Sequence, residues 1–246
     1  MTNIHNGDCM DVMKQMSDES VSCIITDPPY GVCFKNDFYD DTTENVLKNM
    51  PDWFSQWFRL LKTNSYLFVF VGVKTIHQWV QAGVDAGFVF KNIIATRSFN
   101  NGAPTPKNNF GFQFQPILVF SKGRGKNFNE VDFIPTSQEW LKDKRNKNPK
   151  PYTYSYPNWI KTEWGFASAI KKIHPNEKNT DLIKFLIELS TNENDVVFDS
   201  FMGSGSTGIA CIKSNRDFIG VELDEKMFEV AKERIKSQMN NLWGVK

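Results

Sequence analysis

The sequence lacks the patterns that mark secreted, membrane-bound and metal-binding proteins. Its four cysteines, Cys9, Cys23, Cys33 and Cys211, have no paired spacing, so we expect neither a disulfide framework nor a metal site. No stretch approaches the roughly 18 apolar residues of a membrane span. The first ten residues are polar and lack the apolar core of a signal peptide. These absences predict a cytoplasmic protein that does not bind membranes.

The overall charge indicates no particular partner, because 29 basic and 28 acidic residues nearly cancel. The distribution is uneven, however: residues 140–172 contain eight basic side chains and only two acidic ones. This segment is also rich in proline, tyrosine and tryptophan and has no regular periodicity. A charge run is usually only a solvated face, but interleaved aromatic residues also suit the tracking of phosphates on a nucleic acid.

Short apolar runs alternate with helical patterns along most of the 246 residues. Strands are predicted at 21–26, 66–71, 88–96, 112–120, 195–199 and 218–222, and helices at 53–61, 75–86, 180–190, 206–214 and 224–238. This alternation predicts an α/β fold with a doubly wound, mostly parallel sheet. The basic region interrupts the pattern, so we divide the chain into two halves of one domain, 1–122 and 173–246, separated by an insertion at 123–172.

A glycine-rich turn follows the strand predicted at 195–199. Gly203 and Gly205 stand where this strand gives way to a helix, so the backbone can approach a ligand closely and helix N–H groups can face it. Glu222 ends the next strand about 20 residues later, where an acid commonly holds the two hydroxyls of a ribose. A purely structural turn is the alternative, but the combination favours a nucleoside ligand.

The tetrapeptide Asp27-Pro28-Pro29-Tyr30 ends the first of the predicted apolar strands. An exocyclic base amine has a delocalised lone pair and must be drawn toward tetrahedral geometry before it attacks. The Asp27 carboxylate and the Pro28 carbonyl can each accept one amine hydrogen, because the two prolines fix the direction of that carbonyl. Tyr30 offers a face on which an extruded base can stack. Alone, the prolines could simply end the strand; beside the glycine turn and Glu222 they favour chemistry on a base amine.

In this order, the motifs resemble those of the beta class of DNA amino-methyltransferases, in which the catalytic tetrapeptide precedes the cofactor motif. The matching segments are residues 6–9 (Asn-Gly-Asp-Cys), 27–30, 174–178 (His-Pro-Asn-Glu-Lys) and 198–207 with Glu222. The resemblance implies a methyltransferase-type fold, S-adenosylmethionine as the cofactor, a catalytic half at 1–122 and a cofactor-binding half at 173–246. It also implies that the basic insertion recognises the target.

Several site residues are implied by the resemblance alone. Asp8 is expected at the adenine amine of the cofactor, and Lys178 with His174 at its carboxylate end. Asp8 could instead cap a local turn, and His174 could be an interior imidazole. The complete set of expected cofactor contacts is Asp8, Cys9, Asp27, His174, Lys178, Asp199, Phe201, Gly203, Ser204, Gly205, Glu222 and Leu223.

The chain departs from the commonest spellings of the family at three positions. Asn179 stands where a proline often follows the lysine, and Ser200 and Ser206 stand where proline and threonine are frequent. These departures affect the fine geometry of the cofactor site, while the glycines, Glu222 and the tetrapeptide are intact.

Duplex DNA with a flipped base is the expected partner, and the resemblance also allows a homodimer and a cognate restriction endonuclease. The expected DNA contacts are Lys142, Lys144, Arg145 and Lys147 in the insertion, and Asn100 and Lys107 in a second loop. The lysines and the arginine suit phosphates, and asparagine can read adenine edges.

An aspartate at the head of the tetrapeptide favours adenine N6 over cytosine N4 by family analogy, although both amines need the same two acceptors. RNA and protein-glutamine methyltransferases use a similar tetrapeptide, but they usually place the glycine loop before it. A DNA-binding module without turnover is a further alternative, which the intact Asp27 and Glu222 oppose. We therefore expect a site-specific DNA adenine-N6 methyltransferase.

Overall fold

The computed structural model describes residues 1–33, 39–97, 114–129, 131, 159–160 and 178–243. Within these residues, no helix combines the length and the apolar character needed to cross a membrane.

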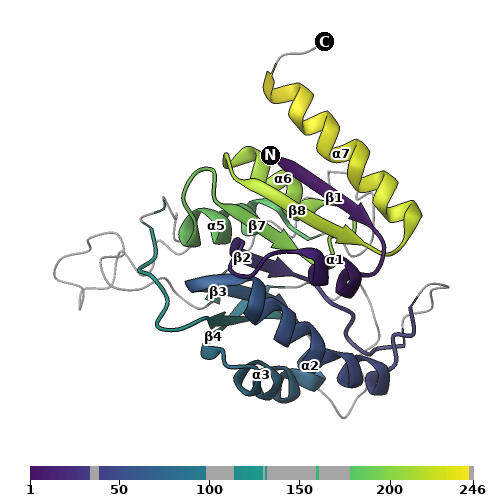
Figure 1. The fold of residues 1–246 in the computed structure, drawn as a ribbon, viewed down its shortest axis with the longest axis vertical. Coiled ribbons are helices and arrows are strands. Elements are labelled where there is room, and N and C mark those ends of the chain that lie inside the picture. Colours follow the sequence, from purple (N-terminus) through teal and green to yellow (C-terminus); the bar gives the residue numbers. More distant parts are fainter. Residues whose placement is uncertain (34–38, 98–113, 130, 132–158, 161–177, 244–246) are drawn as a thin grey trace.

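Eight strands form one sheet in the order β1-β8-β7-β2-β3-β5-β4-β6 (Figure 1). The strands are β1 (Thr2–Asn6), β2 (Val21–Thr26), β3 (Leu61–Phe70), β4 (Val89–Arg97), β5 (Phe114–Ser121), β6 (Trp159–Ile160), β7 (Val196–Asp199) and β8 (Asp217–Glu222). Only β5 runs antiparallel to its neighbours, β3 and β4; the other pairs in this described part of the sheet are parallel. The predicted mostly parallel sheet is confirmed.

Helices cover both faces of the sheet, as expected for a doubly wound fold. They are α1 (Cys9–Gln15), α2 (Thr43–Leu60), the 3₁₀ turn η1 (Val73–Thr75), α3 (Ile76–Asp85), α5 (Thr180–Ser190), α6 (Ser206–Lys213) and α7 (Glu225–Trp243). One hydrophobic core lies between the sheet and α1, α2 and α3, and a second lies between the sheet and α5, α6 and α7. In Figure 1, α2 and α3 run side by side, and α7 lies beside β1.

The helix α2 shows why these elements form. Its buried residues Val46, Met50, Phe54 and Trp57 recur three or four positions apart, so they share one face of the helix. The Phe54 ring packs edge-on against Trp57 at 5.0 Å and against Phe120 of β5 at 5.5 Å. Truncating a large aromatic residue in such a core typically costs about 3–5 kcal/mol. This burial holds α2 against the strands that lead to the site.

Two elements at the N-terminus were not predicted from the sequence. The strand β1 lies at the edge of the sheet and is only partly buried, so it lacks the apolar run of a central strand. The helix α1 has seven residues and buries only Cys9 and Met13. The expected helix at 53–61 also begins earlier, at Thr43, although Pro51 lies inside it.

The connections place the site. The strands β2 and β7 are neighbours in the middle of the sheet. From β2 the chain continues to β3, toward one end of the strand order, and from β7 it continues to β8, toward the other end. The strand order therefore reverses between β2 and β7, and ligands of such sheets bind at the carboxyl ends beside this reversal. The predicted tetrapeptide follows β2 and the glycine turn follows β7, so both lie at the carboxyl ends of these strands.

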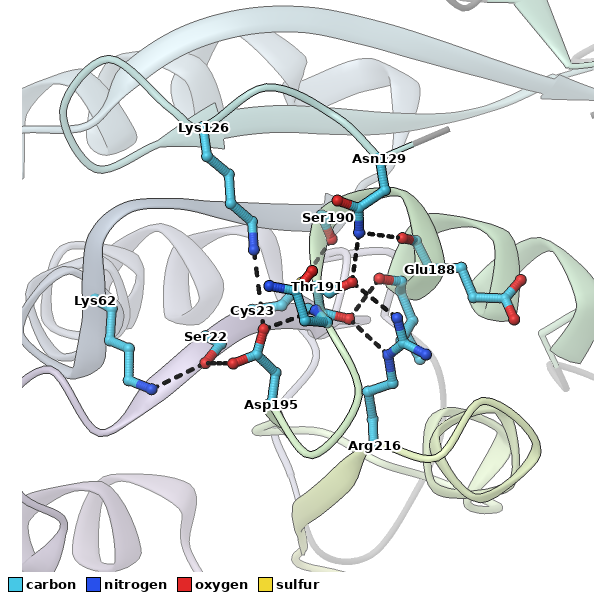
Figure 2. A network of polar contacts seen from close by, with 12 residues as sticks. Ser22, Cys23, Lys62, Lys126, Asn129, Glu188, Ser190, Thr191, Asp195 and Arg216 are labelled. Carbon is cyan, nitrogen blue, oxygen red and sulfur yellow. Dashed lines mark hydrogen bonds and ion pairs between the residues drawn. The ribbon is translucent and has the colours of Figure 1, made fainter. Parts of the chain in front are cut away.

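Near the amino ends of the parallel strands, a polar network holds the segment after β5 against the rest of the domain (Figure 2). The Lys126 ammonium lies 3.8 Å from an oxygen of Asp195, directly before β7. Asn129 donates hydrogen bonds from its backbone N–H and from its side chain to carbonyl groups at the end of α5. The first described residues of the expected insertion, 123–129, therefore pack on the body of the domain.

Candidate active site

Buried hydrogen bonds join the strand end before the tetrapeptide to the strand end before the glycine turn. Thr26, which precedes Asp27, lies with its hydroxyl 3.0 Å from that of Ser200, which follows Asp199. The indole N–H of Trp57 donates to the same Ser200 oxygen at 3.0 Å. All three side chains are buried. The serine that departs from the family's frequent proline thus supplies the oxygen that joins the ends of β2 and β7.

Two polar side chains from distant parts of the chain, those of Lys178 and Gln115, reach Asp27 and Tyr30 of the tetrapeptide. Lys178 Nζ lies 2.8 Å from Asp27 Oδ2 and donates to Tyr30 Oη at 3.2 Å. Tyr30 Oη in turn donates to Asp27 Oδ1, and Gln115 Nε2 donates to Tyr30 Oη. Burial, together with the Asp27 charge, raises the pKa of the Tyr30 hydroxyl well above its usual value. The phenol is therefore a protonated hydrogen-bond donor to Asp27.

Lys178, expected at the carboxylate end of the cofactor, lies at the tetrapeptide in this structure. Its ammonium is 5.5 Å from the centroid of the Tyr30 ring and 5.4 Å from that of Phe70. The next residue, Asn179, caps α5, because its side chain accepts two backbone N–H groups of that helix. This cap holds the backbone next to Lys178. The residue that departs from the family's usual proline therefore fixes the position of the lysine beside Asp27.

The glycine turn needs its two glycines for different reasons. Gly203 and Gly205 both have left-handed backbones, with φ of +50° and +82°. A side chain at Gly205 would approach Ala231 of α7 to 3.1 Å, whereas one at Gly203 would meet nothing within 4 Å. Gly205 therefore allows close packing on α7, and the outer side of the turn at Gly203 is open to a ligand.

The buried carboxylate of Asp199 accepts hydrogen bonds from both sides of the glycine turn. It is 3% exposed and accepts the backbone N–H of Phe201 at 3.1 Å and the hydroxyl of Thr207 at 2.6 Å. Burial raises the pKa of this carboxyl to about 7. The expected cofactor contact of Asp199 remains a prediction, while its hydrogen bonds shape the turn.

Glu222 links the turn to the N-terminal motif. One of its carboxylate oxygens accepts the N–H of Gly203 at 2.8 Å, and the other accepts that of Asp224 at 2.9 Å. Its backbone carbonyl accepts the side chain of Asn6 and the N–H of Gly7, each at 2.9 Å. Burial raises the pKa of the Glu222 carboxyl. The structure thus brings together two motifs that lie at opposite ends of the sequence.

Asp8 has a structural role, as the cap of a helix. Its carboxylate accepts the N–H of Met10 at 2.7 Å and caps α1, while its side chain is exposed at the same edge. The neighbouring Cys9 is buried, and burial raises the pKa of its thiol to about 12. Cys9 therefore packs as a protonated thiol, and the cofactor contacts of both residues stay predictions.

The remaining expected cofactor residues lie around the turn. The Phe201 ring packs edge-on against Trp53 of α2 at 5.1 Å. Ser204 is buried and accepts a hydrogen bond from Arg234 of α7 through its carbonyl. Leu223 is 39% exposed, which leaves an apolar surface next to Glu222. Pro28 is buried and Pro29 is half-buried.

Gln115 was given no role from the sequence. It is a single polar residue at the head of an apolar strand, and its approach to Tyr30 depends on the insertion of β5 beside β3. The predicted residues His174, Lys142, Lys144, Arg145, Lys147, Asn100 and Lys107 lie outside the described residues. The described part of the chain contains no cluster of three or more His, Cys, Asp or Glu side chains that could hold a metal ion.

Comparisons with known proteins agree with this geometry. The sequence model of the N6/N4 DNA methylase family matches residues 21–233. The type II methyltransferase M.HpaI of Haemophilus parainfluenzae is 28% identical over 237 residues, which cover 93% of this chain and 72% of the relative. The DNA adenine methyltransferase YhdJ of Escherichia coli is 27% identical over 254 residues, covering 95% and 82%. The crystal structure of the M1.HpyAVI–SAM complex superimposes with a TM-score of 0.66 at 26% identity, over 95% of this chain and 100% of that one.

Proposed function

The chain belongs to the N6/N4 DNA methylase family, and we propose that it transfers a methyl group from S-adenosylmethionine to the N6 amine of adenine in DNA. One observation carries the proposal: the acidic tetrapeptide and the open glycine turn leave adjacent parallel strands, and buried hydroxyls tie them together. A base amine and a nucleoside cofactor can therefore meet at one edge of the sheet.

The residues of the tetrapeptide supply what a base amine needs. The Asp27 carboxylate and the carbonyl of the buried Pro28 accept the two amine hydrogens, which draws the nitrogen toward tetrahedral geometry and frees its lone pair. The departing proton passes to a carboxylate oxygen of Asp27. The Tyr30 ring offers its face to the extruded base. Preorganised acceptors of this kind are worth about 10²–10⁴ in rate.

The glycine turn fits the adenosine part of the cofactor. The space outside Gly203 is open, and the Glu222 carboxylate beside it is suited to two ribose hydroxyls. The exposed Leu223 suits the adenine ring. When bound, S-adenosylmethionine supplies an electrophilic methyl group. Asp8, Phe201 and Lys178 are assigned to the cofactor by resemblance, and Lys178 also pairs with Asp27.

The adenine target rests on two points. The tetrapeptide begins with aspartate, which favours adenine by family analogy, and one of the similar proteins is named as a DNA adenine methyltransferase. Cytosine N4 presents the same two hydrogens to the same acceptors. We also assign DNA recognition to the basic segment 140–172 and to the loop at 97–107, on sequence alone.

The test is to incubate purified protein with isotopically labelled S-adenosylmethionine and unmodified duplex DNA, digest the DNA, and identify the labelled nucleoside by mass spectrometry. We expect label in N6-methyladenine, and none with transfer RNA as the substrate. Label in N4-methylcytosine would overturn the choice of base. Label in RNA but not in DNA would overturn the proposal itself. An Asp27→Ala preparation made in parallel controls for contaminating host enzymes.

A further inference from the structure

Gln115 reaches the tetrapeptide from β5, the strand that pairs with β3. β5 runs antiparallel to β3, with Ile117 opposite Phe70, so its amino end lies at the carboxyl edge of the sheet. From there the half-buried side chain of Gln115 donates a hydrogen bond to Tyr30 Oη through Nε2. Its backbone is fixed too, because the hydroxyl of Thr96 donates to the Gln115 carbonyl at 2.9 Å.

The direction of the Tyr30 proton follows from counting donors. A phenol has one proton to donate and two lone pairs that can accept. The Lys178 ammonium and the Gln115 amide nitrogen are both donors without an acceptor site, and both are directed at Tyr30 Oη. The single proton of the phenol is therefore left for Asp27 Oδ1, with which it forms a hydrogen bond.

This arrangement fixes the catalytic carboxylate at both oxygens. Tyr30 engages Asp27 Oδ1, and Lys178 lies 2.8 Å from Oδ2, so rotation of the carboxylate would break one of these contacts. Each carboxylate oxygen has more than one acceptor site, so the target amine can still bind. If Gln115 presented its oxygen instead, it would compete with Asp27 for the same proton.

We infer that Gln115 is a positioning residue for methyl transfer, which directs the Tyr30 hydroxyl proton onto Asp27 and so holds the carboxylate in the orientation that the target amine requires. The inference rests on the proposed function, because it assigns to Gln115 a role in that reaction. Gln115 acts through Tyr30 and does not itself contact the reacting atoms.

A double-mutant cycle tests this coupling. Gln115→Leu, Tyr30→Phe and the double variant are compared with the parent in single-turnover methylation of DNA at saturating cofactor and DNA. Equilibrium binding of S-adenosylmethionine to each variant verifies that the site is folded. Gln81→Leu is the matched control, because it removes an exposed amide that donates a hydrogen bond to Asp85 on α3.

Gln115→Leu should slow the transfer step about tenfold, the equivalent of one hydrogen bond, with cofactor affinity preserved. In the Tyr30→Phe background the same change should have almost no effect, because the hydroxyl that Gln115 orients is absent. Equal slowing in both backgrounds, or no slowing in the parent, would overturn the inference. The parent rate with DNA separately tests the proposed function, so failure of the two ideas can be told apart.

Gln115→Glu keeps the shape of the side chain and replaces the donor by an acceptor. At pH 8 the introduced carboxylate should take the Tyr30 proton from Asp27 and slow transfer more than leucine does. The ratio of the Gln115→Glu rate to the parent rate should rise as the pH falls, because the introduced group becomes a donor when protonated. A ratio that does not change with pH would overturn the inference, and this measurement stands even if the leucine variant fails to fold.

Discussion

Replacing Ser200 by alanine should destabilise the domain by about 1–3 kcal/mol, the usual cost of leaving a buried hydrogen-bonding group without its partner. The Ser200 hydroxyl accepts the Trp57 indole N–H and contacts the Thr26 hydroxyl, each at 3.0 Å. Trp57 is fully buried, so the variant leaves its indole N–H without an acceptor away from bulk solvent. For a chain of this size the change corresponds to a fall of roughly 2–12 °C in melting temperature.

Urea denaturation followed by circular dichroism measures this difference, and an unchanged slope with denaturant would show that both proteins unfold similarly. Ser20→Ala is the matched control, because the Ser20 hydroxyl has no hydrogen-bond partner among the described residues. Trp57→Phe should cost less in the Ser200→Ala background than in the parent, since it removes the orphaned N–H. If Ser200→Ala were as stable as Ser20→Ala, the bond between the two strands would not contribute to stability.

Three further predictions concern the cofactor, pH and DNA. Glu222→Ala should weaken S-adenosylmethionine binding by about 1.5–3 kcal/mol in calorimetry, and unchanged affinity in a folded variant would remove Glu222 from the site. Burial raises the pKa of Asp199 from 3.8 to about 7, so the folded protein retains a proton that the unfolded chain releases, and this contribution to stability is lost as the pH rises from about 4 to 7. Asp199→Asn should therefore flatten the free energy of unfolding against pH in that window, and parallel curves for variant and parent would contradict the assignment. Neutralising Lys142, Lys144, Arg145 and Lys147 together should reduce the slope of log DNA affinity against log salt by about 3–4 while cofactor affinity is kept; an unaltered slope would leave the loop at 97–107 as the recognition element.

The central strands and the catalytic motif could be predicted because their signals are local. The strand at 21–26 is a continuous run of buried residues ended by Asp27 and two prolines, and β2 has the same bounds. The glycine turn is equally local, because left-handed backbones at Gly203 and Gly205 require glycine. The edge strand β1 was missed because partial burial leaves no apolar run to detect.

Long-range contacts account for the rest of what was missed. Nothing near Gln115 in the sequence indicates that β5 turns back beside β3 and carries this side chain to Tyr30. Lys178 could be assigned to a motif, but its pairing with Asp27 depends on the packing of α5. Ser200 appeared only as a departure from the family pattern, and its bond to Trp57 appears only in the folded chain.

Single-turnover methylation by Asp27→Ala tests whether the tetrapeptide is the catalytic centre. Asp27 acts on the target amine, and its carboxylate pairs with Tyr30 and Lys178, so the variant should bind both S-adenosylmethionine and DNA. Asp11→Ala, which removes an exposed carboxylate from α1, is the matched control. At saturating cofactor and DNA, we expect Asp27→Ala to transfer the methyl group about 10²–10⁴ times more slowly than the parent. Transfer at close to the parent rate would show that the tetrapeptide is not the catalytic centre.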